Sequence, residues 1–175
     1  MKRAMFSARS SPHLSTFCPS PIKGGGGRIK PYITLGGLDL LRSGMYERAV
    51  IAIGDNRERQ RIAHYYKGLC TWMTLIHPYS FVHSTCSIGD GSVAFGGVVI
   101  QPGIIIGEHR IVKTSASVDH DCFLRDFVHI GPGVRFAGGV TVEEDAFVGA
   151  GAVAIKDVAP YPKSGWCAGQ ENRFD

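Results

Sequence analysis

The residues best suited to chemistry in this chain are His120 and His129. His120 stands between Asp119 and Asp121 in the segment Ser-Val-Asp-His-Asp-Cys. A carboxylate beside an imidazole orients the ring and stabilises its protonated form. The ordinary histidine pKa of ~6.5 suits proton removal at neutral pH. This pattern predicts that His120 acts as a general base and that Asp121 holds it in place.

The elements that position these residues follow from a strict sixfold repeat. Every sixth residue from Ile76 to Ala154 is apolar. The series is Ile76, Val82, Ile88, Ala94, Ile100, Ile106, Val112, Val118, Leu124, Ile130, Phe136, Val142, Val148 and Ala154. Neither a helix, with period 3.6, nor a flat strand, with period 2, keeps a period of six. The repeat predicts a mainly β protein, a hexapeptide parallel β-helix in which each repeat forms one side of a coil.

A second row, four residues after each member of the first, is also expected to point inward. Its members are small or aliphatic except Arg110. A buried, unpaired guanidinium is costly, so we expect the wall to open at Arg110, or Arg110 to reach an edge or a subunit boundary. Glycines recur directly after the first row, at Gly89, Gly107, Gly131 and Gly149. We expect positive φ at these glycines, because the corners of the coil require it.

The spacing of the two histidines predicts a site shared between subunits. Three hexapeptides make one coil, so the nine residues from His120 to His129 are half a coil. The two side chains should therefore leave one chain on different sides. In a symmetric trimer, His120 of one subunit and His129 of the next would line one cleft. A face containing Phe123, Phe127 and Phe147 is expected to need cover in such a trimer.

A short α/β segment precedes the repeats. An apolar run at 48–53 predicts a buried strand, and a helix is expected at 57–69 with one apolar face made of Ile62, Tyr65, Tyr66 and Leu69. Gly54, Asp55 and Asn56 form the turn between them. A strand, a tight turn and a helix make half of a mononucleotide-binding unit, although such a turn is also found as a plain connecting loop.

Charge and composition exclude several classes of protein. Residues 1–38 hold six of the 19 basic residues and no acid, whereas residues 39–175 hold the other thirteen against all 15 acids. The repeats carry no basic stripe with interleaved aromatics, so nucleic-acid binding is not expected. No apolar run is long enough to span a membrane. Five scattered cysteines indicate free thiols in a reducing, cytoplasmic setting rather than disulfides or zinc.

The chain resembles the sugar O-acyltransferase family, which includes sialic-acid O-acetyltransferases and nucleotide-amino-sugar N-acetyltransferases. The resemblance covers about residues 35–158. The motifs that carry it are Ala-Ile-Gly-Asp-Asn at 52–56, Ile-His-Pro at 76–78, Ser-Val-Asp-His-Asp-Cys at 117–122, Asp-Phe-Val-His-Ile-Gly-Pro-Gly at 126–133 and Ala-Gly-Gly-Val at 137–140. The resemblance implies a left-handed parallel β-helix, a homotrimer, acetyl-CoA as donor, and a sugar amine or hydroxyl as acceptor.

The resemblance also implies roles for individual residues. His120 would be the general base and Asp121 would raise its basicity. The positions along acetyl-CoA would be His129, Ala137, Gly138 and Ala150. The positions that meet the nucleotide-sugar would be Gly54, Asp55 and Asn56, with Lys113 standing where the family usually has an asparagine that contacts the sugar.

The expected organisation has four parts. They are a flexible leader at 1–31, an α/β nucleotide-sugar-binding piece at 32–76, the β-helix acyltransferase domain at 77–158 and a tail at 159–175. The family usually opens with a Gly-rich loop containing Gly-His-Gly, and nothing in residues 1–35 matches it, so the α/β piece is expected to be truncated.

Two other function classes stay open at this point. A zinc hydratase of the γ-carbonic-anhydrase type needs three histidines per site, two of them about five residues apart in one chain. The spacings here are eleven from His109 to His120 and nine from His120 to His129, which do not fit, and no metal site is predicted. A non-catalytic interaction protein on the same repeats is the other alternative.

Overall fold

The structure of the protein is a computed structural model that describes residues 39–42, 44 and 47–160. The predicted leader and nearly all of the predicted tail lie outside these residues. The chain divides into two units, residues 1–73 and 74–175.

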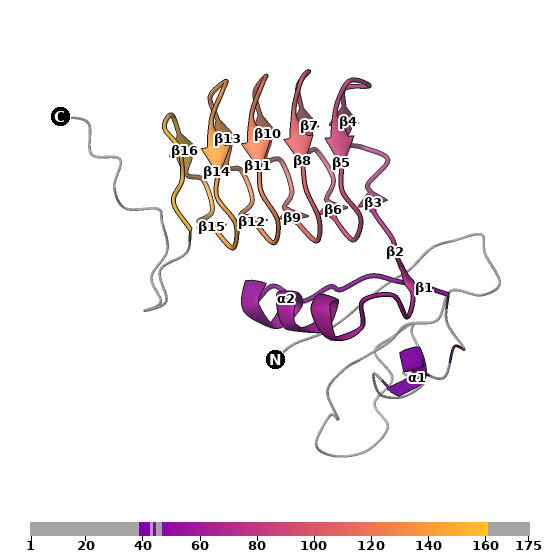
Figure 1. The fold of residues 1–175 in the computed structure, drawn as a ribbon. Coiled ribbons are helices and arrows are strands. Elements are labelled where there is room, and N and C mark those ends of the chain that lie inside the picture. The colour runs from indigo at the N-terminus through magenta and orange to yellow at the C-terminus, as the bar shows by residue number, and fades with distance from the viewer. Residues whose placement is uncertain (1–38, 43, 45–46, 161–175) are drawn as a thin grey trace, which may run out of the picture. The chain divides into compact units, whose positions relative to one another are not determined.

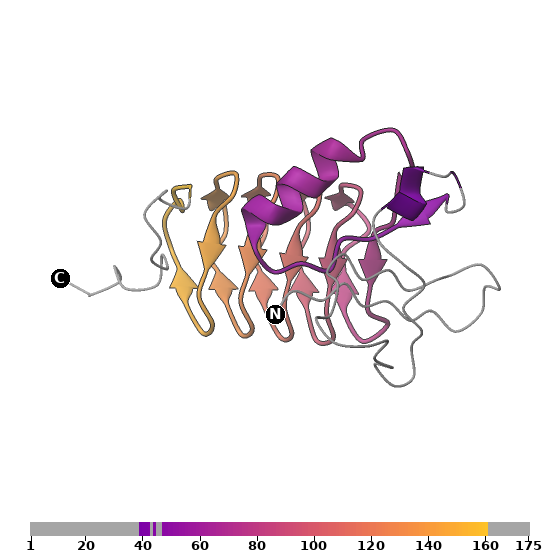
Figure 2. The same cartoon turned by 90° about the horizontal axis from the view of Figure 1, so that it is seen from below.

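The second unit is a parallel β-solenoid, which confirms the predicted β-helix (Figures 1 and 2). Each coil contributes one two-residue strand to each of three sheets. Sheet I contains β4 (Phe81–Val82), β7 (Val99–Ile100), β10 (Ser117–Val118), β13 (Arg135–Phe136) and β16 (Val153–Ala154). Sheet II contains β5 (Ser87–Ile88), β8 (Ile105–Ile106), β11 (Phe123–Leu124) and β14 (Thr141–Val142). Sheet III contains β3 (Leu75–Ile76), β6 (Val93–Ala94), β9 (Ile111–Val112), β12 (His129–Ile130) and β15 (Phe147–Val148).

The register gives a coil of eighteen residues. Ser117 pairs in parallel with Val99 on one side and with Arg135 on the other. The chain turns a corner between sheets I and II, then between II and III, then between III and I. Residues eighteen apart therefore stack along one corner, with neighbouring strands about 4.8 Å apart.

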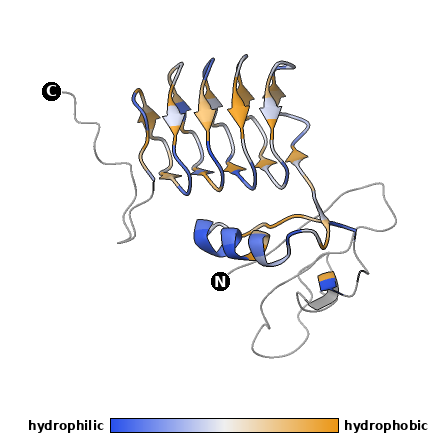
Figure 3. Ribbon diagram, viewed as in Figure 1, coloured by the Kyte–Doolittle hydropathy of each residue, from blue (hydrophilic) through white to orange (hydrophobic). Residues whose placement is uncertain are grey.

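The core of the solenoid consists of the two predicted inward rows. From Ala94 to Ala154 every member of the first row is buried, and so is every member of the second row from Ser92 to Ala146. The strands are accordingly among the more hydrophobic parts of the chain in Figure 3. Burial of this apolar area is the main force that holds the coils together.

The expectation of positive φ at the glycines after the first row is wrong. The left-handed residues lie two positions later in each coil, and include His109, Asp121 and Phe127 with φ of 54°, 58° and 58°. Gly89 and Gly131 instead allow close stacking of adjacent backbones. A Cβ on Gly89 would lie 2.5 Å from the Gly107 carbonyl carbon, and one on Gly131 would lie 2.8 Å from the Ala150 nitrogen.

The first unit contains α1 (Asp39–Arg42), β1 (Arg48–Ala49), α2 (Asn56–Tyr65) and β2 (Thr71–Trp72). β1 pairs in parallel with β2. The predicted strand at 48–53 is thus shorter than expected, although Ile51 and Ile53 are buried as predicted. The predicted helix ends at Tyr65 rather than at residue 69.

The buried side of α2 differs in part from the prediction. Ile62 is buried, but Tyr65 is 57% exposed. The buried side also includes Arg59, and α2 is drawn mostly as hydrophilic in Figure 3. Among the described residues, no helix is long and apolar enough to cross a membrane.

Candidate active site

His120 and Asp121 lie together at the corner between β10 and β11. The His120 Nδ1 atom is 2.9 Å from Asp121 Oδ2, so a neutral imidazole with its proton on Nδ1 donates to the carboxylate. The backbone N–H of His120 donates to Asp119 Oδ1 over 2.8 Å. The His120 side chain is 62% exposed. Both acids that flank His120 in the sequence therefore hold it, one through the ring and one through the backbone.

These contacts raise the pKa of His120 above its ordinary value. The hydrogen bond to Asp121 is the largest cause, and the negative charge of Asp119 acts in the same direction. Exposure leaves little desolvation to oppose them. With Nδ1 held by Asp121, Nε2 is the nitrogen left to accept a proton from a substrate.

The corner between sheets I and II also holds two of the residues expected along acetyl-CoA. Ala137 and Gly138 follow β13, one coil after Asp119 and His120, and the Gly139 N–H donates to the His120 carbonyl over 2.9 Å. Cys122 points inward at this corner, is fully buried, and donates from Sγ to the Ala137 carbonyl. It is a core residue, and burial raises the pKa of its thiol.

His129 lies on a different side of the coil, on β12 in sheet III. It is 8% exposed, and its ring meets that of Phe147 edge-on with centroids 4.9 Å apart. Ala150 follows β15 and is exposed at the corner between sheets III and I. Within one chain the structure therefore separates His120 and Asp121 from His129, as the half-coil spacing predicts, and also from Ala150.

Lys113 lies at the same corner as Ala150, directly after β9. Its ammonium group sits over the Phe95 ring, 4.3 Å from the centroid. This cation–π contact holds the charge on the sheet III side of the chain, away from His120.

The predicted turn at 54–56 forms the N-terminus of α2. Asp55 is the N-cap and accepts from the Glu58 N–H over 2.9 Å. Sequence reasoning missed Arg59, which is fully buried beneath the turn. Its guanidinium donates to the Ile53 carbonyl over 2.9 Å and to Asn56 Oδ1 over 2.8 Å. The sequence signal that could have identified this residue is an arginine about one helical turn after the N-cap residue Asp55.

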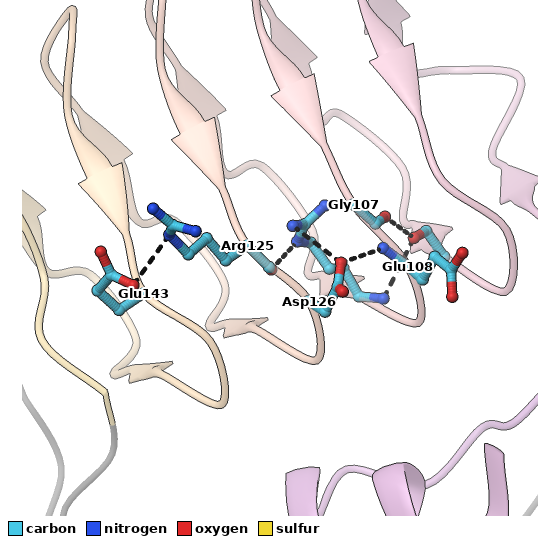
Figure 4. Close-up of polar contacts among 7 residues, drawn as sticks. Gly107, Glu108, Arg125, Asp126 and Glu143 are labelled. Atoms are coloured by element: carbon cyan, nitrogen blue, oxygen red, sulfur yellow. Dashed lines mark hydrogen bonds and ion pairs between the residues drawn. The ribbon is translucent and has the colours of Figure 1, made fainter. Parts of the chain in front are cut away.

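The third corner, between sheets II and III, carries the buried Arg110. The wall does not open there: Arg110 is 1% exposed, and its Nε donates to the Arg125 carbonyl. Its Nη2 lies 3.8 Å from Asp126 Oδ1, which also accepts from the Glu108 N–H (Figure 4). Burial lowers the pKa of Arg110 to about 9, and the nearby carboxylates of Asp126 and Glu108 oppose this shift. The side chain is still charged at neutral pH.

His109, the third histidine considered for a zinc site, lies at the corner between sheets II and III and not at the corner of His120. His109 is buried and stacked on Phe127, with ring centroids 5.4 Å apart and planes at 4°. In the part of the chain that the structure describes, no group of three or more His, Cys, Asp or Glu side chains is placed to hold a metal ion.

Comparisons with known proteins show which family the chain belongs to. No protein-family model matches the chain. The acetyltransferase domain of PglB from Neisseria gonorrhoeae, solved in complex with acetyl coenzyme A, is 31% identical and superposes with a TM-score of 0.69 over 78% of this chain and 77% of that one. The chain belongs to the hexapeptide-repeat sugar acetyltransferases.

Two further members of this acetyltransferase family show the range of the match. PerB from Caulobacter crescentus, solved with CoA and GDP-perosamine, is 31% identical with a TM-score of 0.66, and 74% of this chain and 73% of that one are covered. The GDP-perosamine N-acetyltransferase of Escherichia coli O157:H7 is 32% identical over 114 residues, which are 64% of this chain and 51% of that protein. The chain thus spans about half the length of this curated relative.

Proposed function

We propose that the protein transfers an acetyl group from acetyl-CoA to the amine or hydroxyl of a sugar, and that the acceptor is a nucleotide-linked amino sugar. The observation that carries this proposal is the exposed His120–Asp121 pair at a corner whose next coil offers only Ala137 and Gly138. Neither residue has a side chain beyond Cβ, so no bulky group at this corner blocks the approach of a long, thin thioester such as the pantetheine arm to the imidazole. The family relatives that bind acetyl-CoA or a nucleotide-sugar support the same direction.

The chemistry requires no covalent intermediate with the protein. The nitrogen or oxygen of the acceptor attacks the thioester carbonyl, and its proton passes to His120 Nε2. The C–S bond then breaks, the amide or ester forms, and CoA leaves as the thiolate, which the His120 proton can neutralise. Asp121 keeps the ring oriented and favours its protonated form during the transfer.

The proposed site is completed by a second subunit. His129 lies on sheet III, half a coil from His120, and Ala150 lies at the corner after sheet III, so both serve the His120 of a neighbour in a homotrimer. Exposed apolar side chains on sheet II provide a surface to bury: Ile105 and Phe123 pair across β8 and β11 and are 50% and 48% exposed. The expectation that Phe123, Phe127 and Phe147 share one face is wrong: Phe147 lies on β15 in sheet III and is half-buried, while Phe127 is 5% exposed and packs against His109.

The first unit is proposed to bind the nucleotide-sugar. Gly54, Asp55 and Asn56 form a turn whose shape is maintained by the Arg59 guanidinium. A turn braced by a fully buried cation is ordered before a ligand arrives, which lowers the entropic cost of binding.

The direct test is release of CoA from acetyl-CoA in the presence of a panel of nucleotide-linked amino sugars and free sugars. Wild-type turnover with at least one acceptor is expected, and His120→Ala should reduce kcat by about 10²–10⁴-fold. His83→Ala is the matched control, because His83 lies at the same corner two coils earlier and its Nδ1 contacts Thr85 rather than a carboxylate. Acetyl-CoA binding without turnover on any acceptor would favour the non-catalytic alternative.

A further inference from the structure

The His120–Asp121 pair fits into its corner between two glycines of the adjoining coils. Gly138 is the residue stacked on His120 in the following coil, and Gly103 is stacked on Asp121 in the preceding one. Backbone hydrogen bonds fix this register, from the Gly139 N–H to the His120 carbonyl and from the Asp121 N–H to the Pro102 carbonyl.

The His120 imidazole lies in the space that a side chain at position 138 would occupy. A Cβ built on Gly138 would be 2.6 Å from His120 Cε1 and 2.7 Å from Nε2, closer than real Cβ atoms approach other atoms. A Cβ on Gly103 would collide with Asp121 Oδ1. A side chain at either position is therefore incompatible with the observed geometry of the pair.

We propose that Gly138 and Gly103 are positioning residues for the His120–Asp121 pair, and that their lack of side chains keeps Nδ1 on Asp121 and Nε2 clear for the acceptor. This inference rests on the proposed function only for its catalytic consequence, because the geometry of the pair exists without any substrate.

A methyl group at position 138 should displace the imidazole rather than the backbone. The atoms that it would meet belong to the free end of a side chain that is 62% exposed, so the ring can swing outward into solvent. Such a rotation separates Nδ1 from Asp121 Oδ2. The hydrogen bond that contributes most to the raised pKa of His120 is then lost.

The test compares Gly138→Ala with Gly149→Ala by NMR titration of the histidine rings. Neither glycine has a positive φ, and a Cβ on Gly149 meets nothing within 4 Å, so Gly149→Ala controls for the substitution itself. The pKa of His120 should fall toward ~6.5 in Gly138→Ala and stay at the wild-type value in Gly149→Ala. In Gly138→Ala kcat should fall on the order of 10²-fold, the cost of a misplaced catalytic group.

A second pair of variants keeps the inference decidable if Gly138→Ala does not fold. Gly103→Ala and Gly133→Ala both place alanine at a positive φ, of 75° and 68°, but only position 103 has an atom in the way. The His120 pKa should fall in Gly103→Ala alone. An unchanged His120 pKa in the folded Gly138→Ala and Gly103→Ala proteins, or equal falls in their controls, would overturn the inference. Absence of wild-type turnover with every acceptor would instead overturn the proposed function, and the titration would still decide the role of the glycines.

Discussion

The half-coil separation of His120 and His129 predicts that two impaired variants restore activity to each other. If each site takes His120 from one subunit and His129 from the next, a homotrimer of His120→Ala has no base in any site. A homotrimer of His129→Ala keeps the base but is expected to bind acetyl-CoA weakly. A mixed trimer can contain a site that takes both intact histidines, one from each kind of subunit.

The size of the recovery follows from the threefold arrangement. When equal amounts of the two variants assemble at random, a site is intact only if its His120 side comes from one variant and its His129 side from the other. Each condition holds about half of the time, so about one quarter of the sites should be fully active.

The assay is co-expression of equal amounts of the two variants with different affinity tags, a tandem pull-down to confirm that mixed oligomers form, and measurement of CoA release on the whole unfractionated population at low acetyl-CoA, where His129→Ala alone is expected to be inactive. The control is wild type co-expressed with the double variant. A shared site gives about one quarter of full activity in the control as well, whereas a site within one chain gives about one half in the control and none in the test mixture. Mixed oligomers of the two single variants without recovered activity would refute the shared site.

Three further outcomes are expected. Activity should rise with pH as His120 loses its proton, with an apparent pKa above ~6.5. In Asp121→Asn this rise should occur at lower pH, because the hydrogen bond that raises the His120 pKa is weakened, and the maximal activity should fall. A pH–rate profile of Asp121→Asn that matches the wild type would contradict the role of Asp121. In urea denaturation Arg110→Met should change the free energy of unfolding by less than about 1 kcal/mol, because an apolar side chain replaces a buried charge and Asp126 is half-exposed. Asp126→Ala should lower the free energy of unfolding by roughly 1–3 kcal/mol, because the buried guanidinium loses its acid. A larger loss of stability in Arg110→Met than in Asp126→Ala would show that the cation itself stabilises the corner. Deletion of residues 1–30 should leave the oligomeric state, the melting temperature and acetyl-CoA binding almost unchanged, since that stretch has no acid to pair with its basic residues. A lower melting temperature of the shortened protein would show that these residues stabilise the fold.

The architecture of the solenoid could be predicted from the sequence because its physics is local and repeated. One inward apolar residue in every six, with a second small residue four positions later, is enough to specify a coil of eighteen residues, and the inward rows of the structure match those of the sequence. The candidate base could be found for the same reason, because His120 and the two acids that hold it are neighbours in the chain.

Stacking between coils decided what neighbouring residues could not show. Gly138 lies eighteen residues from His120 in the sequence, and only the closed coil brings this glycine, which has no side chain, next to the imidazole. The glycines after the inward row were predicted to be left-handed, yet none of them has a positive φ, and Gly89 and Gly131 allow adjacent backbones to approach. Arg110 lies in an inward row, but its guanidinium reaches Asp126, sixteen residues later, at a corner. Each of these results depends on which residue lies in the next coil, a relation that exists only after the chain has closed a full turn.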